Sequence, residues 1–255
     1  MSQESARESS RWASRAVQLL FLIALLALWY GLTTWGQVSA ILLPNPLAVL
    51  HELSLVLSTG EFVGDLLTTL SELAFAFSIA MVLGTVTGYL ISRSAYLIAV
   101  LEPLLAGIYA IPIILFLPLY SLLLGLGPPS KIALGATISF FPIALNTIAG
   151  FGNVDKIYLT SAHSMGASGF QLFRFVLVPA ALPVILTGLR MGFTVALLAI
   201  LGSEVLASLS GLGHKIAELD EKMDRAHMFA YIAFAVVIAA VLNSIVSRLE
   251  AKGRR

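Results

Sequence analysis

The sequence predicts an all-α integral membrane protein with six transmembrane helices. Of its 255 residues, 58% are hydrophobic and only 11% are charged, whereas soluble domains carry about 25% charged residues. The mean hydropathy is +0.95. Apolar intervals long enough to cross a bilayer core of about 30 Å recur along the chain. Because backbone groups in hydrocarbon must be satisfied internally, and the alternation typical of barrel strands is absent, these intervals are expected to be helices.

The long intervals between charged residues give the expected spans. They lie at 17–35, 67–91, 98–125, 131–151, 180–206 and 227–248, within a transmembrane domain over 17–250. The first interval follows Arg11 and Arg15, and Val38-Ser39-Ala40 resembles a cleavage site, so a signal peptide is an alternative. The length of the interval and the aromatic residues at its far end favour a retained first helix.

Prolines and small residues predict the shape and packing of the spans. Proline removes a helix hydrogen bond, so kinks are expected at Pro103, Pro112, Pro118 and Pro142. Small residues four apart let membrane helices approach closely. The pairs with this spacing are Gly84 with Gly88 and Gly188 with Gly192.

The distribution of lysine and arginine predicts that both termini are cytoplasmic. With the N-terminus inside, ten of these residues fall on cytoplasmic segments and four fall outside. The outer four are Lys131, Lys215, Lys222 and Arg225. The tails 1–16 and 251–255 and the loop 153–178 then face the cytoplasm of a multi-pass protein of the cell inner (plasma) membrane.

Composition also excludes several kinds of partner and chemistry. The net charge of +1 gives no electrostatic support for nucleic-acid binding. The chain has no cysteine, and its four histidines show no ligand spacing, so no metal site is expected. No phosphate-binding G-x-x-x-x-G-K-[ST] sequence occurs, because Gly125 to Lys131 has the wrong spacing. We therefore expect no cofactor and no enzymatic activity in this chain.

The predicted loop 153–178 is unusual in its detail. Asp155 is suited to start a short helix and Gly166 to end it. A second short helix with an aromatic face is expected before Pro179 opens the fifth span. A plain solvated connector is the alternative, but two short helices with apolar faces are more typical of a docking surface.

This loop resembles the cytoplasmic loop of ABC importer permeases. The family pattern is E-A-A, three residues, G, nine residues, then I-x-L-P. Here Thr160-Ser161-Ala162, Gly166 and Val176-Leu177-Val178-Pro179 keep that spacing, although Thr160 and Ser161 replace the glutamate and the first alanine. The segments 102–134, 166–192 and 210–216 are similar in particular to the nitrate, sulfonate and taurine branch.

The resemblance implies the type I importer permease fold and a set of partners. These are two copies of an ATPase subunit that binds ATP and magnesium, an extracytoplasmic substrate-binding protein, a second permease copy forming a homodimer, and membrane lipid. The loop would dock on the ATPase and couple its closure to alternating access. The residues assigned to this coupling loop are Thr160, Ser161, Ala162, Gly166, Ala167, Phe170, Gln171, Leu172, Phe173, Arg174, Val176 and Pro179.

Within those assignments, Phe170, Leu172 and Phe173 are expected to pack in a groove of the ATPase, and Arg174 to make a polar contact at its edge. Gly166 is expected to form the helix break that orients them.

Polar residues within the spans are candidates for a translocation path. They are Glu72, Asn146, Arg190 and Glu204. For Glu72 and Arg190, interface solvation or a polar pair is the alternative. Glu204 is expected to meet headgroups or the incoming solute, and for Asn146 an interhelical hydrogen bond explains the residue equally well.

Two other functions remain as alternatives. An ion-coupled secondary transporter typically shows internal repeats and carboxylates at the membrane midplane, and neither is visible in the sequence. An intramembrane hydrolase needs a nucleophile and a base, but Gly202-Ser203 lacks that setting and His214 falls in a loop.

Overall fold

The structure, a computed structural model, describes residues 17–18, 20–21, 23–36, 38–39 and 41–253. Every regular element in these residues is a helix. Four helices are long and apolar enough to cross a membrane, and a bent pair gives a fifth candidate. The elements of this set are α3 (Phe62–Ser92), α4 (Ala95–Tyr109) with η1 (Ile113–Phe116) and α5 (Leu117–Leu124), α6 (Pro128–Gly152), α9 (Val178–Leu206) and α11 (Arg225–Gly253).

The expected count of six spans is not confirmed. In the first predicted span, 17–35, residues 17–18, 20–21 and 23–34 are helical, but residues 19 and 22 lie outside the described part, so this span is not counted. Residues 1–16, 19, 22, 37, 40 and 254–255 lie outside the described part, so all of the predicted N-terminal tail and the end of the C-terminal one lie outside it. Residues 251–253 continue α11.

The chain divides into two compact units. The first comprises residues 1–61 and 218–234. It contains α2 (Pro46–Thr59), which starts at Asn45, whose side chain accepts a hydrogen bond from the Leu47 amide. In this unit, Trp29 Nε1 donates to the Pro44 carbonyl at 3.1 Å.

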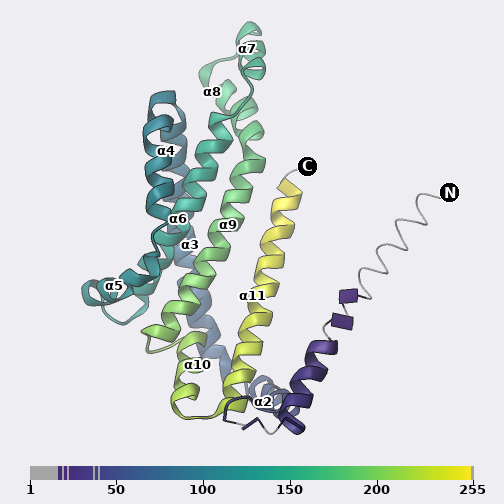
Figure 1. Cartoon of the computed structure of the whole chain (residues 1–255). Helices are drawn as coiled ribbons and strands as arrows, with labels where there is room; N and C mark the ends of the chain where they lie inside the picture. Colours follow the sequence, from purple (N-terminus) through teal and green to yellow (C-terminus); the bar gives the residue numbers. More distant parts are fainter. Residues whose placement is uncertain (1–16, 19, 22, 37, 40, 254–255) are drawn as a thin grey trace, which may run out of the picture. The chain divides into compact units, whose positions relative to one another are not determined.

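The second unit comprises residues 62–217 and 235–255, and α6 packs against both α3 and α9 in it (Figure 1). Glycines allow this close packing. A Cβ atom at Gly84 of α3 would lie 2.9 Å from Ile143 Cγ2, and one at Gly192 of α9 would lie 2.5 Å from Ile143 Cγ1. Gly88 and Gly188 are equally tight, against Thr147 and Asn146. Both small-residue pairs therefore face α6.

The third predicted span, 98–125, is not one continuous helix. The axis turns by 71° between Ala95–Tyr109 and Ile113–Leu124. Pro112 lies at this break as the N-cap of η1, and Pro118 follows at the start of α5. Pro112 has no amide hydrogen and also disfavours helical geometry in the residue before it, which explains the interruption.

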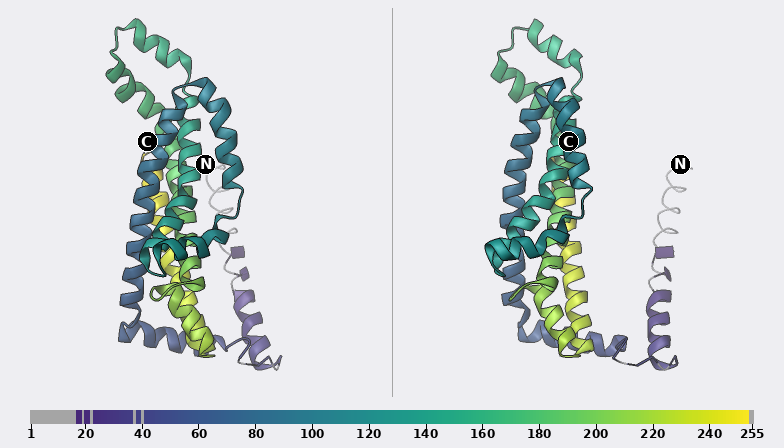
Figure 2. Two further views of the ribbon diagram at one scale, coloured as in Figure 1. Left: turned by 90° about the vertical axis from the view of Figure 1, so that its left-hand side faces the viewer. Right: turned by 60° about the vertical axis from the view of Figure 1, so that its left-hand side comes forward.

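Apolar residues of α3, α9 and α11 form a core in the second unit. Leu73, Phe193, Ala196 and Leu197 are buried, and Leu242 of α11 is among the residues that pack against them. Two short helices, α7 (Lys156–Ser164) and α8 (Gly169–Leu172), follow the C-terminal end of α6. They project from the bundle where α6 ends and α9 begins (Figure 2). They form the predicted loop.

Candidate functional site

Helix α7 begins and ends where the sequence predicts. The Asp155 side chain accepts a hydrogen bond from the Ile157 amide at 2.9 Å and caps the helix. Gly166 has φ +76°, the left-handed conformation that follows many helix ends. The Gly166 amide donates to the His163 carbonyl at 2.9 Å. This turn redirects the chain toward α8.

The second short helix is not separate from the fifth span, which corrects the sequence prediction. α8 starts with a capping box, in which the Ser168 side chain accepts from the Gln171 amide and the Gln171 side chain accepts from the Ser168 amide. It then passes through a π-helical turn, η2 (Phe173–Leu177), directly into α9. Pro179 has no amide hydrogen to donate, and the π turn, which ends two residues before it, accommodates the missing hydrogen bond without breaking the helix. One helix therefore runs from Gly169 to Leu206.

The apolar side chains of this segment divide into an outward and an inward set. Phe170 and Phe175 are exposed. Phe173 instead packs inward, with its ring centroid 5.2 Å from that of Tyr89 and 6.4 Å from that of Phe151. Phe173 is half-buried, and its ring packs against Tyr89 of α3 and Phe151 of α6. The exposed apolar residues of the segment are Ile157, Tyr158, Met165, Phe170 and Phe175.

The remaining residues of the coupling loop surround these side chains. Ala162 is buried, Leu172, Ala167 and Val176 are half-buried, and Ser161 is exposed. Thr160 Oγ1 donates to the Lys156 carbonyl, so the position of the motif's glutamate holds a side chain that bonds within its own helix. The Arg174 guanidinium lies 5.9 Å from the Phe175 ring centroid. A hollow of about 640 Å³ separates α7 from the start of α9 and includes Tyr158, Ser161 and Pro179.

A buried ionic cluster lies at the other end of α6. Lys131, in the first turn of α6, places Nζ 2.8 Å from Glu72 Oε1 of α3, and neither side chain is exposed. Lys131 also donates to Ser208 Oγ at 2.5 Å. The sequence analysis placed Lys131 on the outer side, at the start of the span 131–151, and gave it no partner. Its charge is held inside the bundle because a carboxylate is opposite it.

Glu204 belongs to the same buried region, and its side chain is not exposed. Thr69 Oγ1 donates to Glu204 Oε1 at 2.7 Å, and the Gly213 amide donates to Oε2 at 2.9 Å. Thr69 Oγ1 in turn accepts from the Leu212 amide at 3.0 Å. A Cβ atom at Gly211 would collide with the Glu204 carboxylate. Glu204 thus fixes the segment that leads from α9 into α10 (Leu212–Glu221).

The other two predicted path residues lie on α6 and α9. The Asn146 side-chain amide donates to the Pro142 carbonyl of its own helix at 2.8 Å. Arg190 pairs with Glu250 of α11 at 3.2 Å and is half exposed. The structure therefore brings Glu72 and Glu204 into one region, whereas Asn146 and Arg190 have separate partners.

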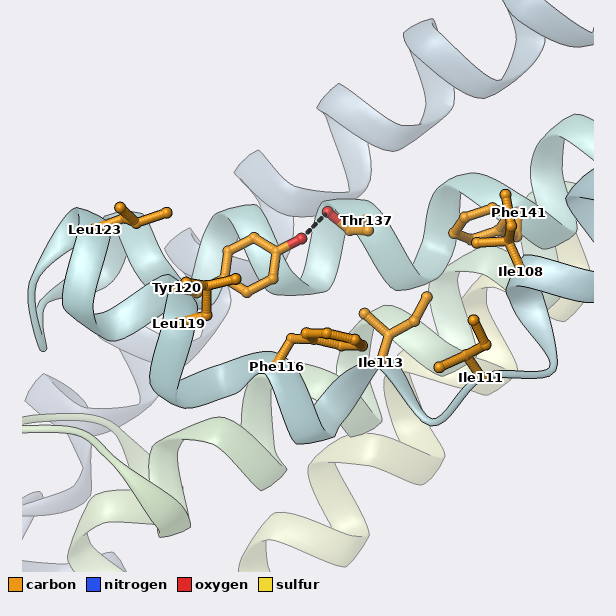
Figure 3. Close-up of a pocket in the computed structure, with 9 residues that line it drawn as sticks. All are labelled: Ile108, Ile111, Ile113, Phe116, Leu119, Tyr120, Leu123, Thr137 and Phe141. Carbon is orange, nitrogen blue, oxygen red and sulfur yellow. Dashed lines mark hydrogen bonds between the residues drawn. The ribbon is translucent and has the colours of Figure 1, made fainter.

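A mostly apolar cavity of about 440 Å³ lies where α4 bends toward α5 (Figure 3). Its one polar feature is the hydrogen bond between Tyr120 Oη and Thr137 Oγ1, at 2.8 Å. The aromatic rings of Phe116 and Phe141 also line it. Such a cavity suits packing or a hydrophobic ligand rather than catalysis.

The comparisons with known proteins decide the family. A family described as "Binding-protein-dependent transport system inner membrane component" matches residues 80–254, more than half of the chain. The chain belongs to this family. The permease is 32% identical over 247 residues to the taurine transport system permease protein TauC of Escherichia coli K12, covering 94% of this chain and 90% of that protein. It is 31% identical over 234 residues to the aliphatic sulfonates transport permease protein SsuC of Bacillus subtilis 168, covering 92% and 85%.

A solved structure shows the same fold. The permease matches a chain of the inward-facing MetNI methionine ABC transporter with a TM-score of 0.63 and 19% identity, over 75% of this chain and 95% of that one. The resemblance to ABC importer permeases and the all-α type I permease fold are therefore confirmed. The relatives are transport subunits rather than enzymes, and the permease is a multi-pass inner-membrane protein.

Sequence reasoning missed the buried pairing of Lys131 with Glu72. Lys131 follows Pro128-Pro129-Ser130, and prolines at the first positions of a helix are a start signal. That signal places Lys131 inside the helix, in the turn at its N-terminal end. Glu72 is the one charged residue of the predicted span 67–91, and it has the charge opposite to that of Lys131, which makes it the natural partner.

Proposed function

We propose that the permease is the membrane subunit of an ATP-driven importer that moves a small sulfonate-type or taurine-like anion into the cytoplasm by alternating access. The solute class is inferred from the names of its relatives. The family name supports delivery by a binding protein, and the absence of a phosphate-binding sequence supports hydrolysis of ATP, with its magnesium, on a separate ATPase chain.

The continuous helix from Gly169 to Leu206 is the observation that carries this proposal. Its first turns lie in the projecting segment, and its remainder packs against α6 and α3. A displacement applied to α8 therefore reaches the centre of the bundle without crossing a flexible joint. Alternating access requires such rigid-body movement.

The exposed apolar residues of the projecting segment, from α7 through η2, are the surface we assign to the ATPase. Phe170 is 69% exposed and Met165 is 81% exposed, on a segment of a membrane protein that carries Arg174 and Lys156 and is expected in the cytoplasm. Exposed apolar patches with a polar rim mark interaction sites. We assign Phe170 and Phe175 to the groove, with Leu172 at its edge, and Phe173 to anchoring the segment on Tyr89 and Phe151.

The anchoring has an energetic reason. Reversing a two-state equilibrium from 1:99 to 99:1 takes about 5.5 kcal/mol of differential binding. A flexible link would dissipate that difference in its own motion. The Asp155 cap, the capping box at Ser168 and the ring of Phe173 each fix the segment to its neighbours.

The assembly we propose has two permease copies and two ATPase copies, with the substrate-binding protein on the outside and both permease termini in the cytoplasm. Of the predicted path residues, Asn146 and Arg190 are the ones that we retain as candidates for contact with the solute. Glu72 and Glu204 face protein groups in this conformation, and we assign them to holding the outer end of the bundle.

Proteoliposomes that contain the permease, its ATPase and the binding protein test the function. Uptake of labelled taurine or a short alkanesulfonate is expected to need ATP on the ATPase side and to continue in the presence of a protonophore. An ion-coupled secondary transporter would show the opposite dependence. Uptake by the permease without the ATPase would contradict the proposal.

A further inference from the structure

Two adjoining hollows lie along α11 near its C-terminal end. The first, about 470 Å³, is mostly polar and lies between α9 and α11, where its lining includes Arg190, Asn243, Ser247 and Arg248. The second, about 380 Å³, runs along α11 and is mostly apolar, with Val237, Val241, Ile245 and other residues on its wall. The hollows share Ala240, Ser244 and Arg248. The polar hollow therefore opens into the apolar hollow along α11, which we call the apolar groove.

The polar hollow carries a positive charge that the protein does not balance. Arg190 pairs with Glu250, whose side chain is 7% exposed. For Arg248, no ion-pair partner occurs among the residues that the structure describes. Of the two arginines that line the hollow, Arg190 is thus paired with a carboxylate, and the positive charge of Arg248 is left without a countercharge among the described residues. Asn243 accepts a hydrogen bond from Thr194 through Oδ1, so its amide NH₂ group is available to donate into the hollow.

The apolar groove lies on the face of a membrane-spanning helix. Val237, Val241 and Ile245 follow one another at four-residue intervals, and all three are exposed. Four-residue spacing places them in one row along the helix. In a bilayer, this row contacts acyl chains, whereas a small water-soluble solute gains nothing from it.

We propose that the two hollows together bind one anionic phospholipid. Its phosphate lies between Arg190 and Arg248, and one acyl chain follows Val237, Val241 and Ile245. A guanidinium matches phosphate oxygens with paired donors, and a phosphodiester supplies the single negative charge that the hollow lacks. Basic pockets between membrane helices on the cytoplasmic side are suited to anionic headgroups. The site shares Arg190 with the proposed translocation path, but its test does not depend on transport.

Native mass spectrometry of the full-length permease, with phosphatidylglycerol or phosphatidylcholine added, tests the site. The wild-type chain is expected to retain one phosphatidylglycerol in preference to phosphatidylcholine. Arg248→Gln is expected to weaken this binding about fivefold, since one arginine near a membrane surface contributes roughly 1 kcal/mol. Arg93→Gln is the matched control, because Arg93 is exposed at the turn between α3 and α4, away from both hollows.

A second variant separates the site from general membrane charge. Ser244→Leu keeps both arginines and places bulk in the wall that the hollows share, so it should also lower retention of phosphatidylglycerol. Equal loss in Arg248→Gln and Arg93→Gln, or equal retention of the two lipids by the wild type, would overturn the proposal. Displacement of the bound lipid by methanesulfonate at transport concentrations would do the same, because the hollow would then belong to the solute.

Discussion

Lys131 Nζ lies 2.8 Å from Glu72 Oε1, and neither side chain reaches solvent. The pair joins the first turn of α6 to α3, and the bond from Lys131 to Ser208 adds the segment after α9. The attraction within a buried ion pair contributes little net stability, because it is offset by the cost of desolvating both charges. Removing one partner is much more costly, since it leaves the other charge buried and unpaired. The Glu72–Lys131 pair therefore fixes how three elements meet at the end of the bundle where α6 begins.

Removing one member of the pair should be costly. Lys131→Met leaves Glu72 buried without its countercharge, and we expect the free energy of unfolding to fall by about 3–5 kcal/mol. Thermal unfolding of the purified permease in detergent measures this. The double variant Glu72→Leu with Lys131→Met should recover most of the loss, because no buried charge remains. A double variant as unstable as Lys131→Met alone would contradict the assignment.

The close contacts around Ile143 should tolerate no added methyl group. A Cβ atom at Gly192 would lie 2.5 Å from Ile143 Cγ1, and overpacking of this kind costs about 1–3 kcal/mol. Gly192→Ala should therefore lower the unfolding temperature. Gly202→Ala, in the same helix with no atom within 4 Å of the new Cβ, should be neutral or slightly stabilising. Equal effects of the two substitutions would refute tight packing between α6 and α9.

Thr69 should control the order of the segment between α9 and α10. Its hydroxyl donates to Glu204 and accepts from the Leu212 amide. Thr69→Val keeps the shape but removes both bonds, and each contributes about 1 kcal/mol. Hydrogen exchange of the 207–216 amides should become faster by about tenfold or more. The amides of α7 serve as the internal reference, and unchanged exchange at 207–216 would count against this role.

The sequence was informative wherever one local signal determines the structure. Asp155 and Gly166 predicted both ends of α7, and the glycine pairs predicted the faces that pack on α6. Contacts between residues that are distant in sequence were harder to predict. Glu72 meets Lys131, and Glu204 meets Thr69, across 59 and 135 positions of the chain. The charge-counting rule treated Lys131 as an outer residue because that rule does not consider buried pairs.

The π turn at Phe173–Leu177 was also beyond the sequence rules. Proline predicts a helix start or a kink, and Pro179 was interpreted as a start. Whether a helix passes through such a residue depends on tertiary contacts, here the packing of Phe173 on Tyr89 and Phe151. The same contacts explain why Phe173 is inward while its neighbours are exposed.

The orientation of the permease is directly testable because the chain has no cysteine of its own. With both termini inside, Ser161→Cys should react with a membrane-impermeant maleimide only after the cytoplasmic face is opened. Lys215→Cys should react in intact cells. Gel-shift labelling distinguishes the two, and the reverse pattern would invert the proposed topology.

The central claim is that the projecting segment passes ATPase closure to α9. The most direct measurement is the number of solute molecules taken up per ATP hydrolysed in proteoliposomes that contain the complete transporter. Phe170→Ala removes an aromatic side chain that is 69% exposed, and we expect it to lower this ratio at least about tenfold while the permease remains folded. His163→Ala, an exposed residue of α7 outside the assigned surface, should leave the ratio unchanged. A wild-type ratio in Phe170→Ala, with the ATPase still assembled on the permease, would contradict the account.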